Sequence, residues 1–212
     1  MGIRHDWWHE EFAKGDPSAQ MGGGDGVQGV PHPTHKWLTE YLPNGSSLLD
    51  VGCCNAHTYE SILRSGKTIN YWGVDHLSEL VEWCQKTYPD ANFSQTDAGD
   101  LQDFEDNSFD YVLSRHVHEH QNHYSQHFME MWRVAKKQVI IVGFLEFTGT
   151  DFDRLQYGVK EGDKFLPHWF NMYSRSGMEK FIAYNMPNSE VEIMEDYEGT
   201  GHPIIIIKKA QS

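Results

Sequence analysis

The segment 116–127 is one of two groups of residues whose types and spacing could do chemistry. Four of its five histidines lie four, three and four residues apart, at His116, His120, His123 and His127. On one continuous helix this spacing would place all four imidazoles on one face, where they could hold a metal ion together with Glu119 or Glu130. Because histidine titrates near neutral pH, the same segment could instead supply a general base.

Asn122 favours the second interpretation. Asparagine is a preferred N-cap residue, so we expect a helix to start near Asn122, which would divide the histidines into two groups. We therefore predict no metal site and assign the role of catalytic base first to His116 and second to His120. Metal binding by the histidine-rich segment stays open as an alternative.

A second group of residues could bind a nucleoside. The apolar run 46–51 ends at Gly52 and leads through small polar residues into a helical pattern from Thr58. This pattern predicts a buried strand, a tight turn and a helix N-terminus. Asp75 ends the next apolar run, 23 residues after Gly52, where a carboxylate can accept hydrogen bonds from both hydroxyls of a ribose.

The elements that must position these residues alternate along the chain. We expect strands at 46–51, 69–75, 91–95, 109–114 and 138–143, and helices at 34–42, from Thr58, 77–84, 124–135 and 176–184. Two later strands, 191–197 and 203–208, are separated by a glycine-containing turn and predict a closing hairpin. Such alternation indicates an α/β sheet that binds its ligand at the carboxyl ends of the strands.

The wording of several segments resembles one enzyme family. Leu48-Leu49-Asp50-Val51-Gly52-Cys53 resembles the first motif of the class I S-adenosylmethionine (SAM)-dependent methyltransferases. The Asp75 strand end, Asp97-Ala98 and Phe109-Asp110-Tyr111-Val112 with the later pair Glu119-His120 follow in the family's order. The resemblance covers residues 46–143 and implies SAM as cofactor. It also implies a Rossmann-like doubly wound sheet, mostly parallel, with a C-terminal antiparallel hairpin strand.

The resemblance also implies a set of cofactor-binding residues. They are Asp50, Gly52, Cys54, Asp75, His76, Asp97, Ala98 and Ser114. Asp75 would take the ribose and Asp97-Ala98 the adenine amino group, which needs a hydrogen-bond acceptor. Cys54, Asn55 and Ala56 depart from the family's glycine-rich loop. Fewer glycines suit a ligand without a pyrophosphate, because the backbone need not close on phosphate groups.

The remaining parts of the chain are expected to form a lid and to bind the methyl acceptor. Residues 1–45 are interpreted as an N-terminal lid and helix, and 46–212 as the SAM-binding methyltransferase domain. Within that domain the aromatic-rich segment 144–175 shows no clean period, follows a central strand and is assigned to substrate binding. Its candidate contacts are Tyr157, His168, Trp169 and Tyr173.

Composition narrows the choice of partner. The formal net charge of −14 disfavours nucleic acid, because a phosphate backbone would be repelled. Three cysteines cannot form a disulfide framework, and no signal peptide or apolar run of membrane length is visible, so we expect a cytoplasmic protein without membrane contact. A small-molecule substrate is expected, and the oligomeric state stays open.

These observations predict a SAM-dependent methyltransferase that methylates a hydroxyl of a small molecule or sugar, with a histidine as general base. A metal-dependent O-methyltransferase and a SAM-binding protein without transferase activity are the alternatives. A short-chain nicotinamide oxidoreductase fits poorly, because that class needs Tyr and Lys four residues apart on a helix, whereas Tyr157 and Lys160 are three apart.

Overall fold

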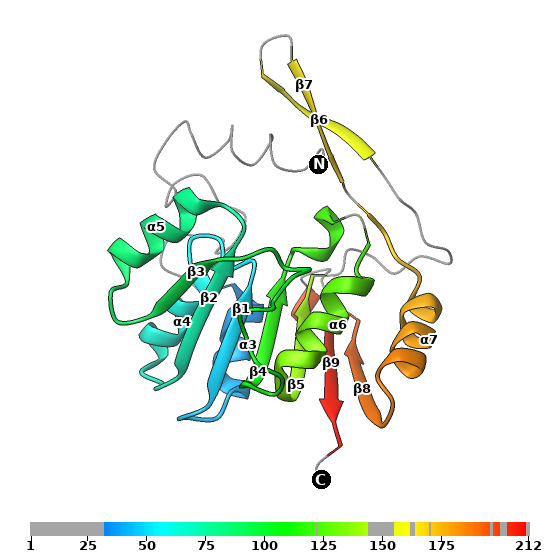
Figure 1. The fold of residues 1–212 in the computed structure, drawn as a ribbon, viewed down its shortest axis with the longest axis horizontal. Coiled ribbons are helices and arrows are strands. Elements are labelled where there is room, and N and C mark those ends of the chain that lie inside the picture. Colours follow the sequence, from blue (N-terminus) through cyan, green and yellow to red (C-terminus); the bar gives the residue numbers. More distant parts are fainter. Residues whose placement is uncertain are drawn as a thin grey trace.

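The computed structural model describes residues 32–121, 123–143, 155–161, 164–169, 171–195, 197–199 and 203–210. Its centre is a seven-stranded sheet in the order β3-β2-β1-β4-β5-β9-β8 (Figure 1). The strands are β1 (Ser47–Val51), β2 (Asn70–Asp75), β3 (Asn92–Gln95), β4 (Phe109–Arg115), β5 (Ala135–Val142), β8 (Ser189–Met194) and β9 (Ile204–Lys209).

The first five strands run parallel, and β9 runs antiparallel to both of its neighbours, β5 and β8. The prediction of a mostly parallel, doubly wound sheet with an antiparallel hairpin strand is confirmed. Because the chain leaves β1 for β2 on one side and later enters β4 on the other, the topological switch lies between β1 and β4. Ligands of such sheets bind at the carboxyl ends of these two strands.

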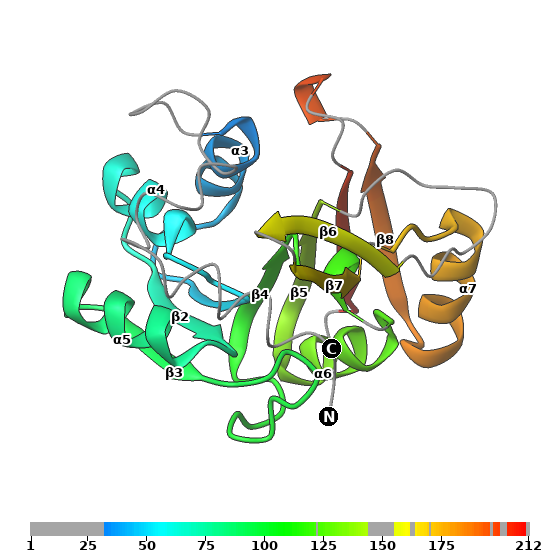
Figure 2. The same cartoon turned by 90° about the horizontal axis from the view of Figure 1, so that it is seen from above.

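Helices cover both faces of this sheet (Figure 2). One face carries α3 (Pro33–Tyr41), α4 (His57–Ser65) and α5 (Ser78–Thr87), and the other carries α6 (Ser125–Val134) and α7 (Arg175–Asn185). A 3-10 helix, η1 (His118–His120), follows β4, and a second, η2 (Tyr197–Gly199), lies between β8 and β9.

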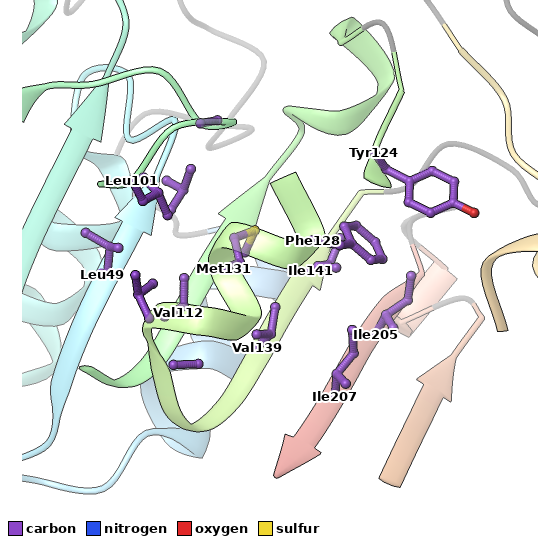
Figure 3. Close-up of a cluster of buried hydrophobic side chains, with 14 of the residues drawn as sticks. Leu49, Leu101, Val112, Tyr124, Phe128, Met131, Val139, Ile141, Ile205 and Ile207 are labelled. Atoms are coloured by element: carbon purple, nitrogen blue, oxygen red, sulfur yellow. The ribbon is translucent and has the colours of Figure 1, made fainter. Parts of the chain in front are cut away.

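The alternation of side chains along the strands divides the core into two layers. Leu49 and Val112 point toward α6, where Figure 3 shows Met131 beside them, whereas Leu48 and Leu113 point toward α3 and α4. Parallel strands covered on both faces must be apolar on both faces, which explains their continuous Leu, Val and Ile runs. The rigid layers fix the strand ends that carry the candidate site.

The structure corrects two of the predicted boundaries. Helix α6 starts at Ser125 with Tyr124 as its N-cap and ends at Val134, and β5 starts directly at Ala135 rather than at residue 138. The early start extends β5 along β4, with Ala135 in register with Phe109. Asn122, the predicted helix start, lies outside the described residues.

The sequence predicted an irregular segment over residues 144–175, but part of this segment is regular. It contains an antiparallel hairpin of β6 (Leu155–Glu161) and β7 (Lys164–Trp169). Both views show this hairpin above the carboxyl edge of the sheet, over β4 and β5, and β7 contacts η1 (Figures 1 and 2). Antiparallel pairing between two neighbouring backbone runs produced a regular element that the aromatic pattern did not show.

Within the described part of the chain, no helix combines the length and apolar character needed to cross a lipid bilayer.

Candidate active site

The loop after β1 is built from backbone conformations that glycine prefers. Gly52, Cys54 and Ala56 have φ values of +76°, +51° and +61°. At Gly52 an added Cβ would lie 2.3 Å from Cγ2 of Val117, so only glycine fits between β1 and the segment after β4. Cys54 and Ala56 adopt left-handed conformations although they carry side chains. Glycine, which is common in the corresponding loop of the family, would fit at both positions.

Asp75 joins this loop to the end of β2. Its Oδ2 accepts a hydrogen bond from the Cys54 backbone N–H at 3.0 Å, and its Oδ1 accepts one from Leu77 N–H at 3.1 Å. His76 Nδ1 lies 3.3 Å from the same Oδ1. The carboxylate is 6% exposed, so the loop and the start of α5 hold it in place at the strand end. Each oxygen can accept a second hydrogen bond, which is what two ribose hydroxyls require.

Asp50 lies deeper, beneath the loop. Its Oδ2 accepts a hydrogen bond from the Tyr71 hydroxyl at 2.8 Å, and the residue is 2% exposed. Burial raises the pKa of Asp50 to about 6, although the Tyr71 and Thr58 hydroxyls and the nearby Arg115 guanidinium act in the opposite direction. Direct contact of Asp50 with a cofactor stays a prediction, and the observed geometry gives it a supporting position under the loop.

The thiols of the loop are not activated. Burial raises the pKa of the Cys54 thiol, and a hydrogen bond with Cys84, together with burial, raises the pKa of the Cys53 thiol. Cys84 Sγ in turn donates to the Cys54 carbonyl at 3.2 Å. These cysteines therefore stabilise the loop as neutral groups, because only the thiolate is a strong nucleophile.

Asp97 and Ala98 occupy the next strand end. Asp97 is exposed, and its Oδ1 accepts a hydrogen bond from Gly99 N–H at 2.7 Å, which fixes the turn after β3. Ala98 is 9% exposed and packs in the core, so its backbone, rather than its methyl group, is placed to meet a ligand. An exposed carboxylate at this edge has the acceptor chemistry that an adenine amino group needs.

The end of β4 carries Ser114 and His116. Ser114 is fully buried in register with Val51 of β1, and its Oγ has no hydrogen-bond partner among the described residues. The side chain of His116 is 27% exposed, and its Nδ1 lies 2.9 Å from Oε1 of Glu119. Burial lowers the pKa of His116 to about 4, and the Arg115 guanidinium acts in the same direction, so the ring is neutral at neutral pH.

The other histidines face different surroundings. His118 and His127 are 1% and 4% exposed and pack against each other with ring centroids 5.6 Å apart, and burial lowers the pKa of His118. His123 stacks on Tyr124, and His120 lies on η1, not on α6. Among the residues that the structure describes, no three His, Cys, Asp or Glu side chains are arranged to hold a metal ion.

The residues that were predicted to contact the methyl acceptor occupy different places in the structure. Tyr157 lies on β6, and His168 and Trp169 lie on β7, in the hairpin above the carboxyl edge, but their side chains are outside the described part of the structure. Tyr173 is 1% exposed, and its hydroxyl donates to the His118 carbonyl at 3.1 Å. Its ring packs in the core with Tyr124 and Phe128, and contact of Tyr173 with a substrate stays a prediction. The proposed lid before residue 32 lies outside the described residues.

Sequence reasoning missed the partners of His116. Glu119 was considered only as a metal ligand, although a spacing of three residues from His116 already allowed contact across one turn. Gly143 also lies against His116, but it could not be recognised from the sequence, because the chain after β5 brings it there. Arg115 precedes His116 directly in the chain and acts on the ring through its charge.

The chain is similar to known proteins in sequence over part of its length and in its overall fold. Residues 49–143 match the family model described as a methyltransferase domain. No curated protein sequence matches the chain. A SAM-dependent methyltransferase from Aquifex aeolicus has a similar structure, with a TM-score of 0.58 and 17% identity over 84% of this chain and 89% of that chain.

Two similar structures were solved with a ligand bound. The 1,6-didemethyltoxoflavin-N1-methyltransferase of Burkholderia thailandensis holds 1,6-didemethyltoxoflavin and S-adenosylhomocysteine; its TM-score is 0.62 and its identity 14%, over 85% of this chain and 78% of that chain. Magnesium protoporphyrin IX methyltransferase of Synechocystis PCC 6803 holds SAM; its TM-score is 0.57 and its identity 13%, over 84% and 76% of the two chains.

The family match over residues 49–143 and the shared fold support the resemblance to the class I SAM-dependent methyltransferases that the order of the motifs implied. The cofactor of this chain is SAM. The residues at the carboxyl edge fit this cofactor, because a held carboxylate ends β2, an exposed carboxylate follows β3, and a tight loop follows β1.

Proposed function

We propose that this enzyme methylates a hydroxyl group of a small molecule or sugar, with His116 as the general base. The observation that carries the proposal is the position of His116. It follows β4 at the switch point, and the next residue, Val117, packs directly against Gly52 of the cofactor loop. A neutral imidazole at this place can accept a proton at neutral pH.

SAM, when bound, supplies an activated methyl group attached to a sulfonium. The chain's own task is then to align the acceptor, exclude water and remove one proton. Alignment alone can lower a barrier by about 7 to 11 kcal/mol. As the methyl group leaves the sulfonium sulfur for the hydroxyl oxygen, the hydroxyl proton would pass to a ring nitrogen of His116, which later releases it to solvent.

A small acceptor is favoured over a macromolecule. The net charge of −14 opposes binding of a phosphate backbone. The hairpin of β6 and β7 lies over the carboxyl edge, where an acceptor would enter, and it carries Tyr157, His168 and Trp169. One structurally similar methyltransferase holds the small heterocycle 1,6-didemethyltoxoflavin. We propose no contact with membranes or nucleic acid, and a cytoplasmic location.

The test begins with calorimetry of the full chain against SAM, S-adenosylhomocysteine and NAD. We expect binding of the first two and none of NAD. A screen of hydroxylated acceptors with SAM carrying a labelled methyl group follows, and we expect a methyl ether as product. Transfer only to nitrogen or carbon acceptors would contradict the O-methylation, and SAM binding without any turnover would favour the alternative of a SAM-binding protein.

A further inference from the structure

The turn after β3 carries the expected adenine contacts, Asp97 and Ala98, and continues without helix or strand to residue 106. Within this segment Leu101 is fully buried and Phe104 is 8% exposed. Both belong to the core cluster that includes Met131 of α6, and Figure 3 shows Leu101 on the side of that helix. Their burial brings backbone N–H and C=O groups that have no strand neighbour toward the interior, where such groups need hydrogen-bond partners.

Side chains of α6 supply these partners. Gln126 Nε2 donates to the Gly99 carbonyl at 2.7 Å, and Glu130 Oε2 accepts from the Leu101 N–H at 2.9 Å. Residues 126, 130 and 133 follow one another at spacings of four and three, so they lie in one row on the helix. A groove beside Met129 lies between this row and the turn, so hydrogen bonds rather than apolar packing fix the turn on this side.

Arg133 ends the row and serves two carbonyls at once. Its Nη2 donates to the Leu101 carbonyl at 2.9 Å, and its Nη1 donates to the Phe104 carbonyl at 2.8 Å. The same guanidinium donates to both carboxylate oxygens of Glu130 and to Asp106 Oδ1. It holds the pKa of Glu130 below its usual range, so this carboxylate stays charged at neutral pH. A planar fork with five N–H donors can make all these bonds, whereas an ammonium group cannot.

The turn is linked from this row to Asp97 through Gly99. Gly99 is bonded on both sides, because its carbonyl accepts from Gln126 and its N–H donates to Asp97 Oδ1 at 2.7 Å. The Asp97 carbonyl also accepts from Asp100 N–H at 2.9 Å. Among the described residues, Oδ2 of Asp97 has no hydrogen-bond partner, so this oxygen is available to a ligand. A shift of the turn relative to α6 would therefore move the Asp97 carboxylate.

We infer that Arg133 is a positioning residue of the cofactor site: through the carbonyls of Leu101 and Phe104 it fixes the turn after β3, so that Asp97 meets the amino group of adenine. The inference rests on the expected adenine contact of Asp97 and uses neither the acceptor nor the base of the proposed function. A segment without regular pairing can adopt several conformations. Bonds that select one of them before the cofactor arrives lower the cost of ordering the site.

The test compares two ligands by calorimetry of the full chain. One is S-adenosylhomocysteine, and the other is its analogue with purine in place of adenine, which lacks only the amino group. We expect wild type to bind S-adenosylhomocysteine about 10-fold or more tightly than the analogue, because the analogue cannot donate to a carboxylate. Asp97→Ala should bind both ligands about equally.

Arg133→Met keeps the length of the side chain and removes its donors. It should reduce the preference for S-adenosylhomocysteine to about threefold or less, because the displaced carboxylate no longer meets the amino group. A role confined to stability would instead weaken both ligands alike and keep the preference, and that result overturns the inference. Arg175→Met is the matched control, because Arg175 lies on α7 and pairs with Glu179 and Glu195 at the surface. It should keep the wild-type preference.

A second variant covers the case in which Arg133→Met does not fold. Gln126 is exposed, and Gln126→Ala removes only the bond to the Gly99 carbonyl. Its preference for S-adenosylhomocysteine should fall about threefold relative to wild type, less than expected for Arg133→Met, because the other bonds of the row remain. If only this variant folds and it keeps the full preference, the inference is overturned.

The assignments fail in different ways. A wild type or an Asp97→Ala variant that departs from expectation removes the adenine contact, and the inference falls with it. If Asp97→Ala loses the preference while folded Arg133→Met keeps it, the contact stands and the positioning role fails. If the ligand preferences behave as expected but no methyl ether forms in the acceptor screen, the proposed O-methylation fails and Arg133 keeps its role.

Discussion

The carboxyl edge of the sheet has two halves that use buried carboxylates in different ways. In the cofactor half, formed by loop 52–56 and Asp75, the carboxylate accepts hydrogen bonds from backbone N–H groups. In the histidine half, formed by residues 116–120 and Gly143, the Glu119 carboxylate engages a side chain that can exchange a proton. The first arrangement holds a loop in shape, and the second places a buried acidic side chain against an imidazole.

This difference teaches where each kind of mutation should act. Changes in the cofactor half should weaken SAM binding, because they alter a preformed loop. Changes in the histidine half should lower turnover and leave SAM affinity intact, because the ring is needed only when the proton moves.

His116→Asn should lower kcat about 10²- to 10⁴-fold, the usual contribution of a general base, and leave the SAM dissociation constant unchanged. His120→Asn should have a smaller effect. The wild-type kcat/KM should fall only as the pH drops toward 4, because burial lowers the pKa of His116 to about 4 and the base is lost once protonated. Steady-state kinetics and calorimetry measure both quantities; normal turnover in both variants would exclude His116 and His120 as the base.

Asp75→Ala should weaken SAM binding about 10²-fold or more, because two charge-assisted hydrogen bonds, each about 1.5 to 3 kcal/mol, are removed and Cys54 N–H loses its acceptor. Calorimetry with SAM measures the change. Asp90→Ala, on the exposed turn before β3, is the matched control and should bind SAM normally. Equal affinity in the folded Asp75→Ala variant would remove Asp75 from the cofactor half.

Asp50→Asn should alter how stability depends on pH. The pKa of Asp50 is raised from 3.8 to about 6 in the folded chain, so the native state binds a proton that the unfolded state releases between these values. Wild-type stability from this group is therefore present below pH 4 and lost as the pH rises through about 6, by about 3 kcal/mol. Denaturant unfolding at pH 4 and pH 8 should show the variant gaining stability relative to wild type at the higher pH.

Chelator treatment should change neither activity nor Tm. The histidines of 116–127 are divided between the end of β4, η1 and α6, and the described residues contain no group of three metal-binding side chains. Activity assays and thermal unfolding with and without EDTA measure the effect. Activity lost on chelation and restored by one divalent ion would instead support the metal-dependent alternative.

The local sequence was sufficient to predict the cofactor half. Its strand, glycine turn and Asp75 are marked by an apolar run, a breaker and a carboxylate at fixed separations, and all three depend on short-range backbone preferences. The sheet was predictable for the same reason, since alternating strand and helix patterns permit few topologies. Ile204–Ile207 indicated a buried strand, but only the fold places β9 between β5 and β8, with these residues buried on both faces.

The histidine half was decided by tertiary structure. The sequence determined that histidines and a glutamate follow the fourth strand, but Gly143 is the residue after β5 and Asn171 comes from beyond the β6 and β7 hairpin. Their contacts with His116 and Glu119 join residues that are distant in the chain, so no local spacing encodes them. Tyr173 shows the same limit, because an aromatic residue suits a pocket or a core equally, and only packing against Tyr124 and Phe128 makes it part of the core.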